Sequence, residues 1–520
     1  MKIKIINKIS LLALAFFLAA SCSQDFLDKQ PLDQRVESNF YQTQSDAEEA
    51  LVAVYDVIGW NTVVGFHSLP MFADIASDDS YAGGASRNDA PNIIEVDQHN
   101  IRTTNGEILG FWKKYYTGIY RANLYLEKID GIDADPAFIT RSIAEVKFIR
   151  AYYYFDLLRL FENVPLLTET LKSQSEYSQP QASPEQIYNQ VATDLVEAIP
   201  GLPEVIPATE NGRVSKWAAK ALLGRVYLYV NGVYGANLNG GGKTIGQAEA
   251  LAEVEDVIAN GGYSLLDNFA ANFSKDGEFS VESVFEISYS DARPWYDWGY
   301  IQGGEGNIAV QMQGPRVDDP GLEAYERGWS FSPVTQSLYD AFEDGDPRRE
   351  ATILHQDEFV GGLTIGYQHT GYFTKKYTTT KEYKPAEGQL ELNWGNNYRV
   401  IRYSDVLLMA AELGSPNAQD YLDQVRGRVG LPSAPATLDN IYQERRVELA
   451  LEGHRYFDLL RRGLDVAENA ISVSGEIGPL YQGDAQEFDV VFKPVNKGLF
   501  PIPQTEVDIS NGVYNQNAGY

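Results

Sequence analysis

The stretch from residue 441 to residue 463, IYQERRVELALEGHRYFDLLRRG, is the strongest candidate for acid–base chemistry in this sequence. Glu444, Glu448 and Glu452 recur every four residues, and this spacing places the carboxylates on one face of a helix. Two such carboxylates can act as the acid and the nucleophile of a glycosidase. One hypothesis is therefore a glycoside hydrolase that uses Glu448 or Glu452.

Arginines in the same stretch favour a structural role. Arg455 follows Glu452 by three residues, Asp458 follows Arg455 by three, and Arg461 and Arg462 follow Asp458 by three and four. A guanidinium within helical reach stabilises an ionised carboxylate and opposes the raised pKa that a general acid needs. We therefore expect an ion-pair lattice and no catalytic residue here, and the glycosidase is the remote alternative.

Nucleotide and metal chemistry have weaker support. The run NGGGKT at 239–244 lacks the first glycine of a phosphate-binding loop, because Asn237 stands there, and it follows a predicted helix where that motif follows a strand. The five histidines form no HxxxH or HExxH pair, and no acidic run has the EF-hand spacing. We predict a turn at NGGGKT, no cofactor and no catalytic metal, and leave a structural metal open.

Aromatic residues gather in two long connections, residues 60–100 and residues 285–335. The second contains ARPWYDWGY, in which Trp295, Tyr296, Trp298 and Tyr300 lie among Pro, Asp and Gly and cannot all face one core. Flat aromatic faces suit sugar rings, and an exposed aromatic surface indicates a ligand or a partner protein. The candidate ligand-binding residues are Trp60, Asp78, Tyr81, Trp295, Tyr296, Trp298 and Trp329.

Helical periodicity supplies the scaffold for these loops. Ser45 with Glu48, and Ser183 with Gln186, fit capping boxes at the starts of two amphipathic segments. Further helices are predicted within residues 106–129, 141–161, 214–230 and 403–414. Residues 223–227 match the L-G-x-x-Y core of tetratricopeptide repeats, although no strict 34-residue period persists. We predict a mainly α fold, a tetratricopeptide-like superhelix of helical pairs with a long, irregular, loop-rich ligand face and minor β-structure.

The single cysteine, Cys22, follows a positively charged, apolar and then small-residue sequence typical of a secretory signal peptide. Its position resembles a bacterial lipobox, with the departure that Leu18 stands four residues before the cysteine and Ala19 three before. The resemblance implies that residues 1–21 are removed and that Cys22 is lipidated. The alternative is an ordinary secreted protein with a stray cysteine.

The composition limits the possible partners. The 520-residue chain is 44% hydrophobic and 22% charged, which is typical of a globular protein, and no second apolar run is long enough to span a membrane. The net charge of −30 repels nucleic-acid phosphates, and no Lys/Arg block compensates for it. We therefore exclude nucleic acid as a ligand.

Several segments together resemble the SusD/RagB family. They are CSQDFLDKQP, EVKFIRAYYYFDLLRLFENVPL, RYSDVLLMAAE, LDQVRGRVGLP, the charged stretch above and the ending LFPIPQTEVDISNGVYNQNAGY. The resemblance implies a non-enzymatic lipoprotein on the outer surface of a Gram-negative cell, anchored in the outer membrane by its lipid alone. It also implies a partner, a SusC-like TonB-dependent outer-membrane transporter. Residues 22–235 and 236–520 would form two regions packed as one globular unit.

The leading hypothesis is a protein that captures a nutrient glycan, most often an oligosaccharide or polysaccharide in this family, and delivers it to the transporter. The second hypothesis keeps the fold and the partner but has a peptide as cargo. The family's sugar-contacting residues vary between members, so none of the candidate ligand-binding residues is inferred from the resemblance. The identity of the glycan is also left open.

Overall fold

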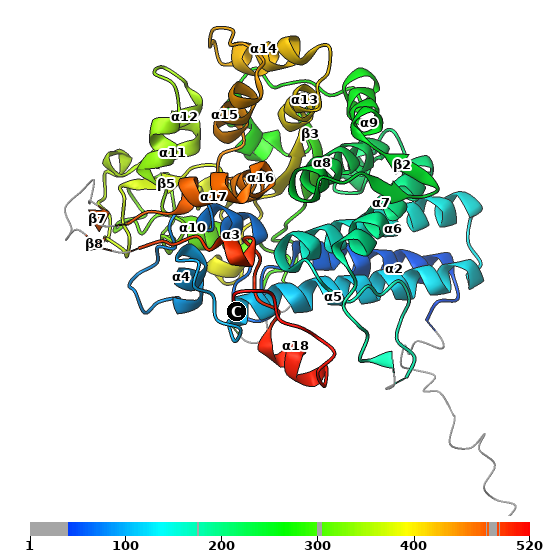
Figure 1. The fold of residues 1–520 in the computed structure, drawn as a ribbon. Helices are drawn as coiled ribbons and strands as arrows, with labels where there is room; N and C mark the ends of the chain where they lie inside the picture. The colour runs from blue at the N-terminus through cyan, green and yellow to red at the C-terminus, as the bar shows by residue number, and fades with distance from the viewer. Residues whose placement is uncertain (1–39, 174–175, 299–303, 475, 478–485, 488) are drawn as a thin grey trace, which may run out of the picture.

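The computed structural model describes residues 40–173, 176–298, 304–474, 476–477, 486–487 and 489–520, so Cys22 and Tyr300 lie outside the described residues. Long helices fill one side of the molecule, and irregular segments with short helices and strands fill the other (Figure 1). The α-helices of the described residues are α2 (Gln44–Asp56), α3 (Leu69–Ile75), α4 (Pro91–Asp97), α5 (Gly106–Lys128), α6 (Pro136–Phe161), α7 (Pro184–Ala198), α8 (Lys216–Tyr234), α9 (Gln247–Asn260), α10 (Ile308–Gln313), α11 (Gln336–Ala341), α12 (Arg348–Thr352), α13 (Tyr403–Glu412), α14 (Ala418–Arg428), α15 (Leu438–Glu448), α16 (Arg455–Arg462), α17 (Leu464–Ile471) and α18 (Gln504–Ile509).

The β-structure of the described residues consists of short antiparallel pairs. They are β1 (Leu238–Gly240) with β2 (Lys243–Ile245), β3 (Ser283–Ile287) with β6 (Tyr398–Arg402), β4 (Ile353–His355) with β5 (Tyr372–Thr374), and β7 (Glu476–Ile477) with β8 (Gln486–Glu487). The NGGGKT run is the tight turn of the β1–β2 hairpin, where Gly241 and Gly242 adopt φ angles of 58° and 74°. This left-handed backbone explains the glycines, and the preceding element is helix α8, as predicted.

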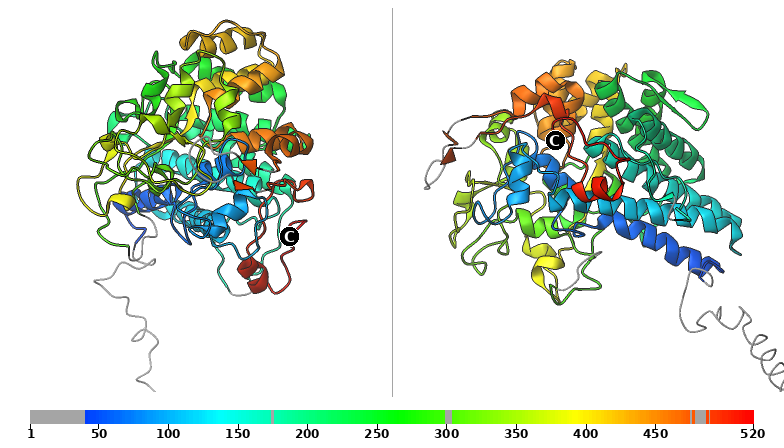
Figure 2. Two further views of the ribbon diagram at one scale, coloured as in Figure 1. Left: turned by 90° about the vertical axis from the view of Figure 1, so that its left-hand side faces the viewer. Right: turned by 60° about the horizontal axis from the view of Figure 1, so that its bottom comes forward.

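Successive helices pack against one another as pairs, which confirms the predicted fold class. Contacts run from α5 to α6, from α6 to α7, from α7 to α8 and from α8 to α9, and α2 lies along α5 (Figure 2). Small residues permit this close approach: a Cβ added at Gly118 would lie 2.2 Å from the Tyr153 ring, and one at Gly224 would lie 2.3 Å from Val254. The Tyr153 ring fills the space opposite Gly118, and the Val254 side chain fills the space opposite Gly224.

The helix starts follow local hydrogen-bonding chemistry. Ser183 accepts from the amide of Gln186, and the Gln186 side chain accepts from the amide of Ser183, so the capping box predicted for α7 is confirmed. The box predicted at Ser45 is wrong. Thr43 caps α2 in reciprocal hydrogen bonds with Asp46, and Ser45 already lies inside the helix.

The charged stretch at 441–463 is not one helix, which corrects the predicted geometry. Helix α15 ends at Glu448, and α16 begins at Arg455. Between them Leu451 and Gly453 adopt φ angles of 60° and 76°, a left-handed backbone that interrupts helical hydrogen bonding. Glu452 therefore lies in the turn and does not share a helical face with Glu444 and Glu448.

The two long connections pair with each other. Ser80 bridges Val334, and Gly83 bridges Phe331, in antiparallel register. The amide of Tyr81 donates to the Pro333 carbonyl at 3.0 Å, which closes the ladder. The loop-rich side is thus held by strand-like pairing between segments that are 250 residues apart in sequence.

Candidate ligand-binding surface

The carboxylates of the charged stretch lie in a buried network of arginines. Glu448 accepts from Arg348 at 3.1 Å, from Arg402 at 2.9 Å and from Arg428 at 2.6 Å. Glu452 accepts from Arg402 at 2.8 Å and from Lys376 at 2.7 Å. Of the partners of Glu448, none comes from its own helix, so the ion pairs form between elements and not along α15.

The same network disfavours a role as general acid for these two residues. Burial by itself raises the pKa of Glu448, but Arg428, Arg402 and Arg348 outweigh it and hold the pKa well below its usual value. Arg402 and Lys376 likewise lower the pKa of Glu452 against the effect of its burial. Both side chains are at most 1% exposed, so neither can reach a sugar or serve as a general acid. The structural role that we predicted for this stretch fits the geometry.

The individual pairs differ from those predicted by helical spacing. Arg455 does not bind Glu452; it reaches Asp78 in the first long connection through two hydrogen bonds of 2.7 and 2.9 Å. Arg446 binds the same carboxylate at 2.9 Å. Asp458 does bind Arg461 at 2.8 Å, as predicted, but Arg462 lies near Asp439 at 3.8 Å.

Two of the predicted ligand-binding residues have largely enclosed side chains, which argues against that role. Asp78 is enclosed by Arg446 and Arg455, which lower its pKa although burial raises it. It ties the first long connection to α15 and α16. Trp60 is 4% exposed, and the Arg121 guanidinium lies 4.9 Å from the centre of its ring. Its position just after α2 places the ring in the core, where it cannot stack on a ligand.

Other aromatic candidates come together at one surface, which we call the tryptophan surface and define as Phe66, Trp298 and Trp329. The rings of Trp298 and Trp329 stack at a centroid distance of 5.9 Å and an interplanar angle of 26°. The rings of Phe66 and Trp329 pack edge-to-face, with their centroids 5.6 Å apart and an interplanar angle of 61°. Trp298 is 42% exposed, whereas Trp329 is half-buried beneath it. The sequence analysis did not select Phe66, because one phenylalanine in a loop carries no distinguishing pattern.

The backbone on both sides of this stack is anchored. The Trp329 amide donates to the Gln311 carbonyl at 2.9 Å, and Arg316 Nε donates to the Trp329 carbonyl at 2.9 Å. On the other side the Trp295 amide donates to Asn393 Oδ1 at 2.8 Å, three residues before Trp298. The Trp329 backbone is thus held directly, and the segment that carries Trp298 is held at Trp295; a held backbone loses less freedom when a ligand binds.

The remaining candidates flank this surface or lie beneath it. Tyr296 is 65% exposed, and its hydroxyl donates to Glu387 at 2.8 Å. Trp295, which directly precedes Tyr296 in sequence, is half-buried against the core. Tyr81 is half-buried in the paired segment, where burial and the neighbouring Asp97 raise its pKa to about 12. Of the described members of the predicted cluster, therefore, Tyr296 and Trp298 are exposed and Trp295 is half-buried.

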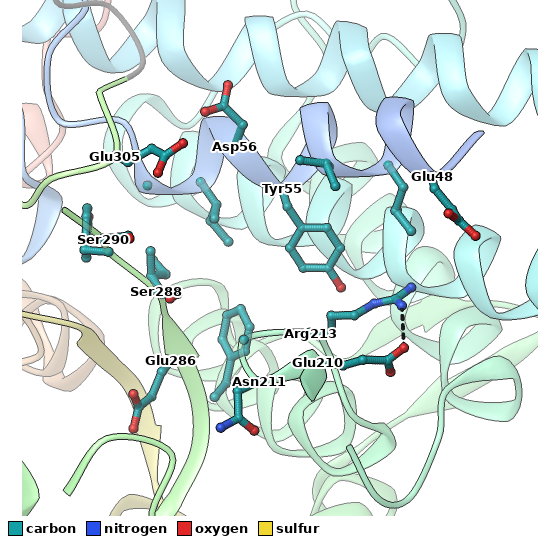
Figure 3. A pocket seen from close by; sticks show the side chains of 18 of the residues that line it. Glu48, Tyr55, Asp56, Glu210, Asn211, Arg213, Glu286, Ser288, Ser290 and Glu305 are labelled. Atoms are coloured by element: carbon teal, nitrogen blue, oxygen red, sulfur yellow. Dashed lines mark hydrogen bonds and ion pairs between the residues drawn. The ribbon is translucent and has the colours of Figure 1, made fainter. Parts of the chain in front are cut away.

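A separate cleft of about 910 Å³ lies between α2, the first turns of α6, residues 210–213 and the end of β3 (Figure 3). Its walls carry many acids, namely Glu48, Asp56, Glu210, Glu286 and Glu305. Arg213 binds Glu210 at 3.2 Å, and the Tyr55 hydroxyl donates to Glu145 at 2.8 Å. The aromatic residues along this cleft are buried or half-buried, so it lacks the open ring faces of the tryptophan surface.

The described residues show no arrangement for a metal or a membrane span. No group of three or more His, Cys, Asp or Glu side chains among them is placed to hold a metal ion. In the same part of the chain, no helix combines the length and the apolar composition required to cross a membrane.

Fold and surface together define a class: a scaffold of helical pairs whose loops present stacked tryptophans and whose charged core is structural. Two family models match the chain. One is described as the SusD family, over residues 362–520, and the other as starch-binding associating with outer membrane, over residues 25–228.

Known SusD-like proteins are similar to this chain along nearly its whole length. The SusD-like protein P25 of Formosa agariphila is 28% identical, over 89% of this chain and 92% of the relative. A solved structure described as a laminarin binding SusD-like protein is 36% identical, covers 92% of this chain and 100% of its own, and superposes with a TM-score of 0.81. Surface glycan-binding protein A from Bacteroides thetaiotaomicron, solved in complex with laminarihexaose, is 30% identical, with the same coverage and the same TM-score. The chain belongs to the SusD/RagB family.

Proposed function

We propose that the protein is a non-enzymatic binding protein for a laminarin-type glycan and that the tryptophan surface makes the main contact. The observation that carries the proposal is the anchored Trp298–Trp329 stack on the loop-rich face. The two solved relatives whose descriptions name laminarin and laminarihexaose support this choice of ligand. The buried, ionised state of Glu448 and Glu452 supports binding without hydrolysis.

Isothermal titration of the purified protein against a polysaccharide panel tests this proposal. We expect saturable binding of laminarin and weaker or no binding of polysaccharides with other linkages. If no polysaccharide in the panel binds and peptides bind tightly, the result would indicate peptide capture. Release of reducing sugar by the protein would contradict the non-enzymatic part.

The proposal includes a location and a partner. A lipid on Cys22 would tether the protein to the outer membrane, where a SusC-like TonB-dependent transporter would receive the glycan. The description of the family model that matches residues 25–228 supports association with the outer membrane. Two or three acyl chains hold a protein stably on a membrane, whereas one chain binds only marginally.

Replacing Cys22 by alanine should therefore move the protein out of the outer-membrane fraction or leave it as an uncleaved precursor. Fractionation of cells followed by mass determination of the N-terminus measures both outcomes. Laminarin affinity of the purified variant should equal that of the wild type, because the residues of the tryptophan surface, at positions 66, 298 and 329, are far from Cys22 in sequence. A correctly processed variant that stays on the membrane would show that Cys22 is not the anchor.

A further inference from the structure

A second aromatic surface lies beside helix α5, in a groove of about 690 Å³ between α5, residues 165–171 and 177–179, and the C-terminal segment. Helix α18 lies close to the start of α5 (Figure 2), and the Gln504 amide donates to the Thr103 carbonyl at 2.8 Å. We call this the tyrosine groove. Its aromatic members are Trp112, Tyr116, Tyr120, Tyr177 and Tyr514.

Helix α5 arranges three of these rings along one line. Trp112, Tyr116 and Tyr120 are four residues apart, a spacing that places them on the same helical face. Trp112 is buried and packs on Tyr116 at a centroid distance of 4.9 Å. The Tyr116 hydroxyl donates to the Pro165 carbonyl at 2.8 Å, which fixes that ring between the helix and the following loop. Tyr120 is the exposed end of this row of three rings.

The distribution of exposed rings separates this groove from the rest of the surface. Among the described residues, the aromatic side chains that are classed as exposed are Tyr120 at 51%, Tyr177 at 62%, Tyr296 at 65% and Trp298 at 42%. Two of these line the tyrosine groove, and two belong to the loop of the tryptophan surface. Exposed aromatic area is thus concentrated at two places, as expected of surfaces that contact a ligand.

One short turn connects the two places. Val63 and Val64 line the tyrosine groove, whereas Phe66, two residues later, contacts Trp329 of the tryptophan surface. Thr62 and Phe66 form an antiparallel β-bridge, which closes this turn. Since consecutive Cα atoms are 3.8 Å apart, Val64 and Phe66 lie within about 8 Å of each other. The linings of the two surfaces therefore come close to each other at this turn.

The polar groups of the groove suit an uncharged, hydroxyl-rich ligand. Its charged side chains are one base, Lys113, and one acid, Glu506, and Thr117 and Gln179 supply a hydroxyl and an amide. This balance offers no charged cluster that would select a phosphate or a polyanion. Tyrosine faces together with a few polar groups are the usual composition of a site for neutral ligands such as sugars.

We infer that the tyrosine groove is a second contact site for the same glycan, so that a long chain binds the tryptophan surface and the groove at once. The inference rests on the proposed function, because the occupant is a further stretch of the glycan bound at Trp298. The inference predicts that affinity increases with the length of the glycan. Once one segment of the glycan is bound, the next segment is present near the second site at a high effective concentration.

The test compares ligands of increasing length on the wild type and on a variant that lacks both exposed tyrosine rings. Laminarin and a series of shorter laminari-oligosaccharides are titrated into the wild type and into the double variant Tyr120→Ala/Tyr177→Ala. By analogy with bases on aromatic rings, loss of stacking should weaken laminarin binding at least about fivefold. The shortest oligosaccharide that binds the wild type should bind the double variant equally well.

A ring-preserving variant and a distant substitution serve as controls. Tyr120→Phe/Tyr177→Phe should retain most of the laminarin affinity, because the ring faces remain. Val205→Ala, at a side chain that is 79% exposed outside the lining of either site, should change nothing. Both tyrosines are exposed, so the alanine variant should melt within a few degrees of the wild type.

The outcomes separate this inference from the proposed function. If Trp298→Ala loses laminarin but the tyrosine variants bind every length like the wild type, the groove is not a glycan site and the proposed function stands. An equal loss for short and long ligands would also overturn the inference, because a second site affects only chains that reach it. If the wild type binds no glucan of any length, both proposals fail together.

Discussion

Replacing Glu448 by glutamine is expected to reduce the free energy of unfolding by about 3–5 kcal/mol, the usual cost of breaking a buried ion pair by removing one partner. The side chain is fully buried between Arg348, Arg402 and Arg428. Glutamine has the same shape but no charge, so it leaves these guanidiniums undercompensated and turns an amide NH₂ toward them. Urea denaturation at neutral pH, followed by circular dichroism, measures the loss.

The pH dependence of this difference provides a second check. The folded-state pKa of Glu448 is depressed below its ordinary value of 4.5, so the ionised form stabilises the fold above pH 4.5. That contribution is lost as the pH falls from 4.5 toward the folded-state pKa. The stability gap between the wild type and Glu448→Gln should therefore narrow below pH 4.5 and stay constant above it.

A matched substitution at the surface controls for the loss of one negative charge. Glu350 is 68% exposed and lies 3.3 Å from Arg349, and Glu350→Gln should change stability by less than about 0.5 kcal/mol. Laminarin affinity of the remaining folded protein should be unchanged in both variants. A loss below about 1 kcal/mol in Glu448→Gln, or a selective loss of ligand binding, would contradict the structural role.

Truncation of Trp298 is expected to have the largest effect on binding. By the measured range for bases stacked on aromatic rings, Trp298→Ala should cost about 1–3 kcal/mol, or about a 5- to 150-fold weaker affinity for laminarin. Trp298 forms the outer, 42% exposed ring of the stack on Trp329. Titration of the isolated protein should show the loss without a transporter present.

Two comparisons separate stacking from other causes. Trp298→Phe keeps a smaller ring and should recover part of the affinity. Leu322→Ala, at an exposed leucine that is not part of the tryptophan surface, should bind like the wild type. Trp298→Ala should retain the stability of the wild type within about 1 kcal/mol, because the ring is substantially exposed. Normal laminarin binding with loss of the transporter complex would identify this loop as a docking surface.

Local sequence patterns were sufficient for the scaffold. Helical periodicity predicted the long helices, and Ser183 with Gln186 marked the start of α7, because a capping box needs only groups within one turn. The arginines around Glu448 indicated a structural role, since any guanidinium nearby keeps a carboxylate ionised. The ordered series of short segments was sufficient to indicate the SusD/RagB family.

The tertiary structure decided which side chains share a surface. Arg348, Arg402 and Arg428 reach Glu448 from elements up to 100 residues away, and no spacing rule connects them. Trp60 and Trp298 are both loop tryptophans in sequence, yet packing after α2 buries the first and the anchored loop exposes the second. Hydrogen bonds within a turn depend on neighbouring residues alone, whereas burial and ion pairing depend on which distant segments the whole fold brings together.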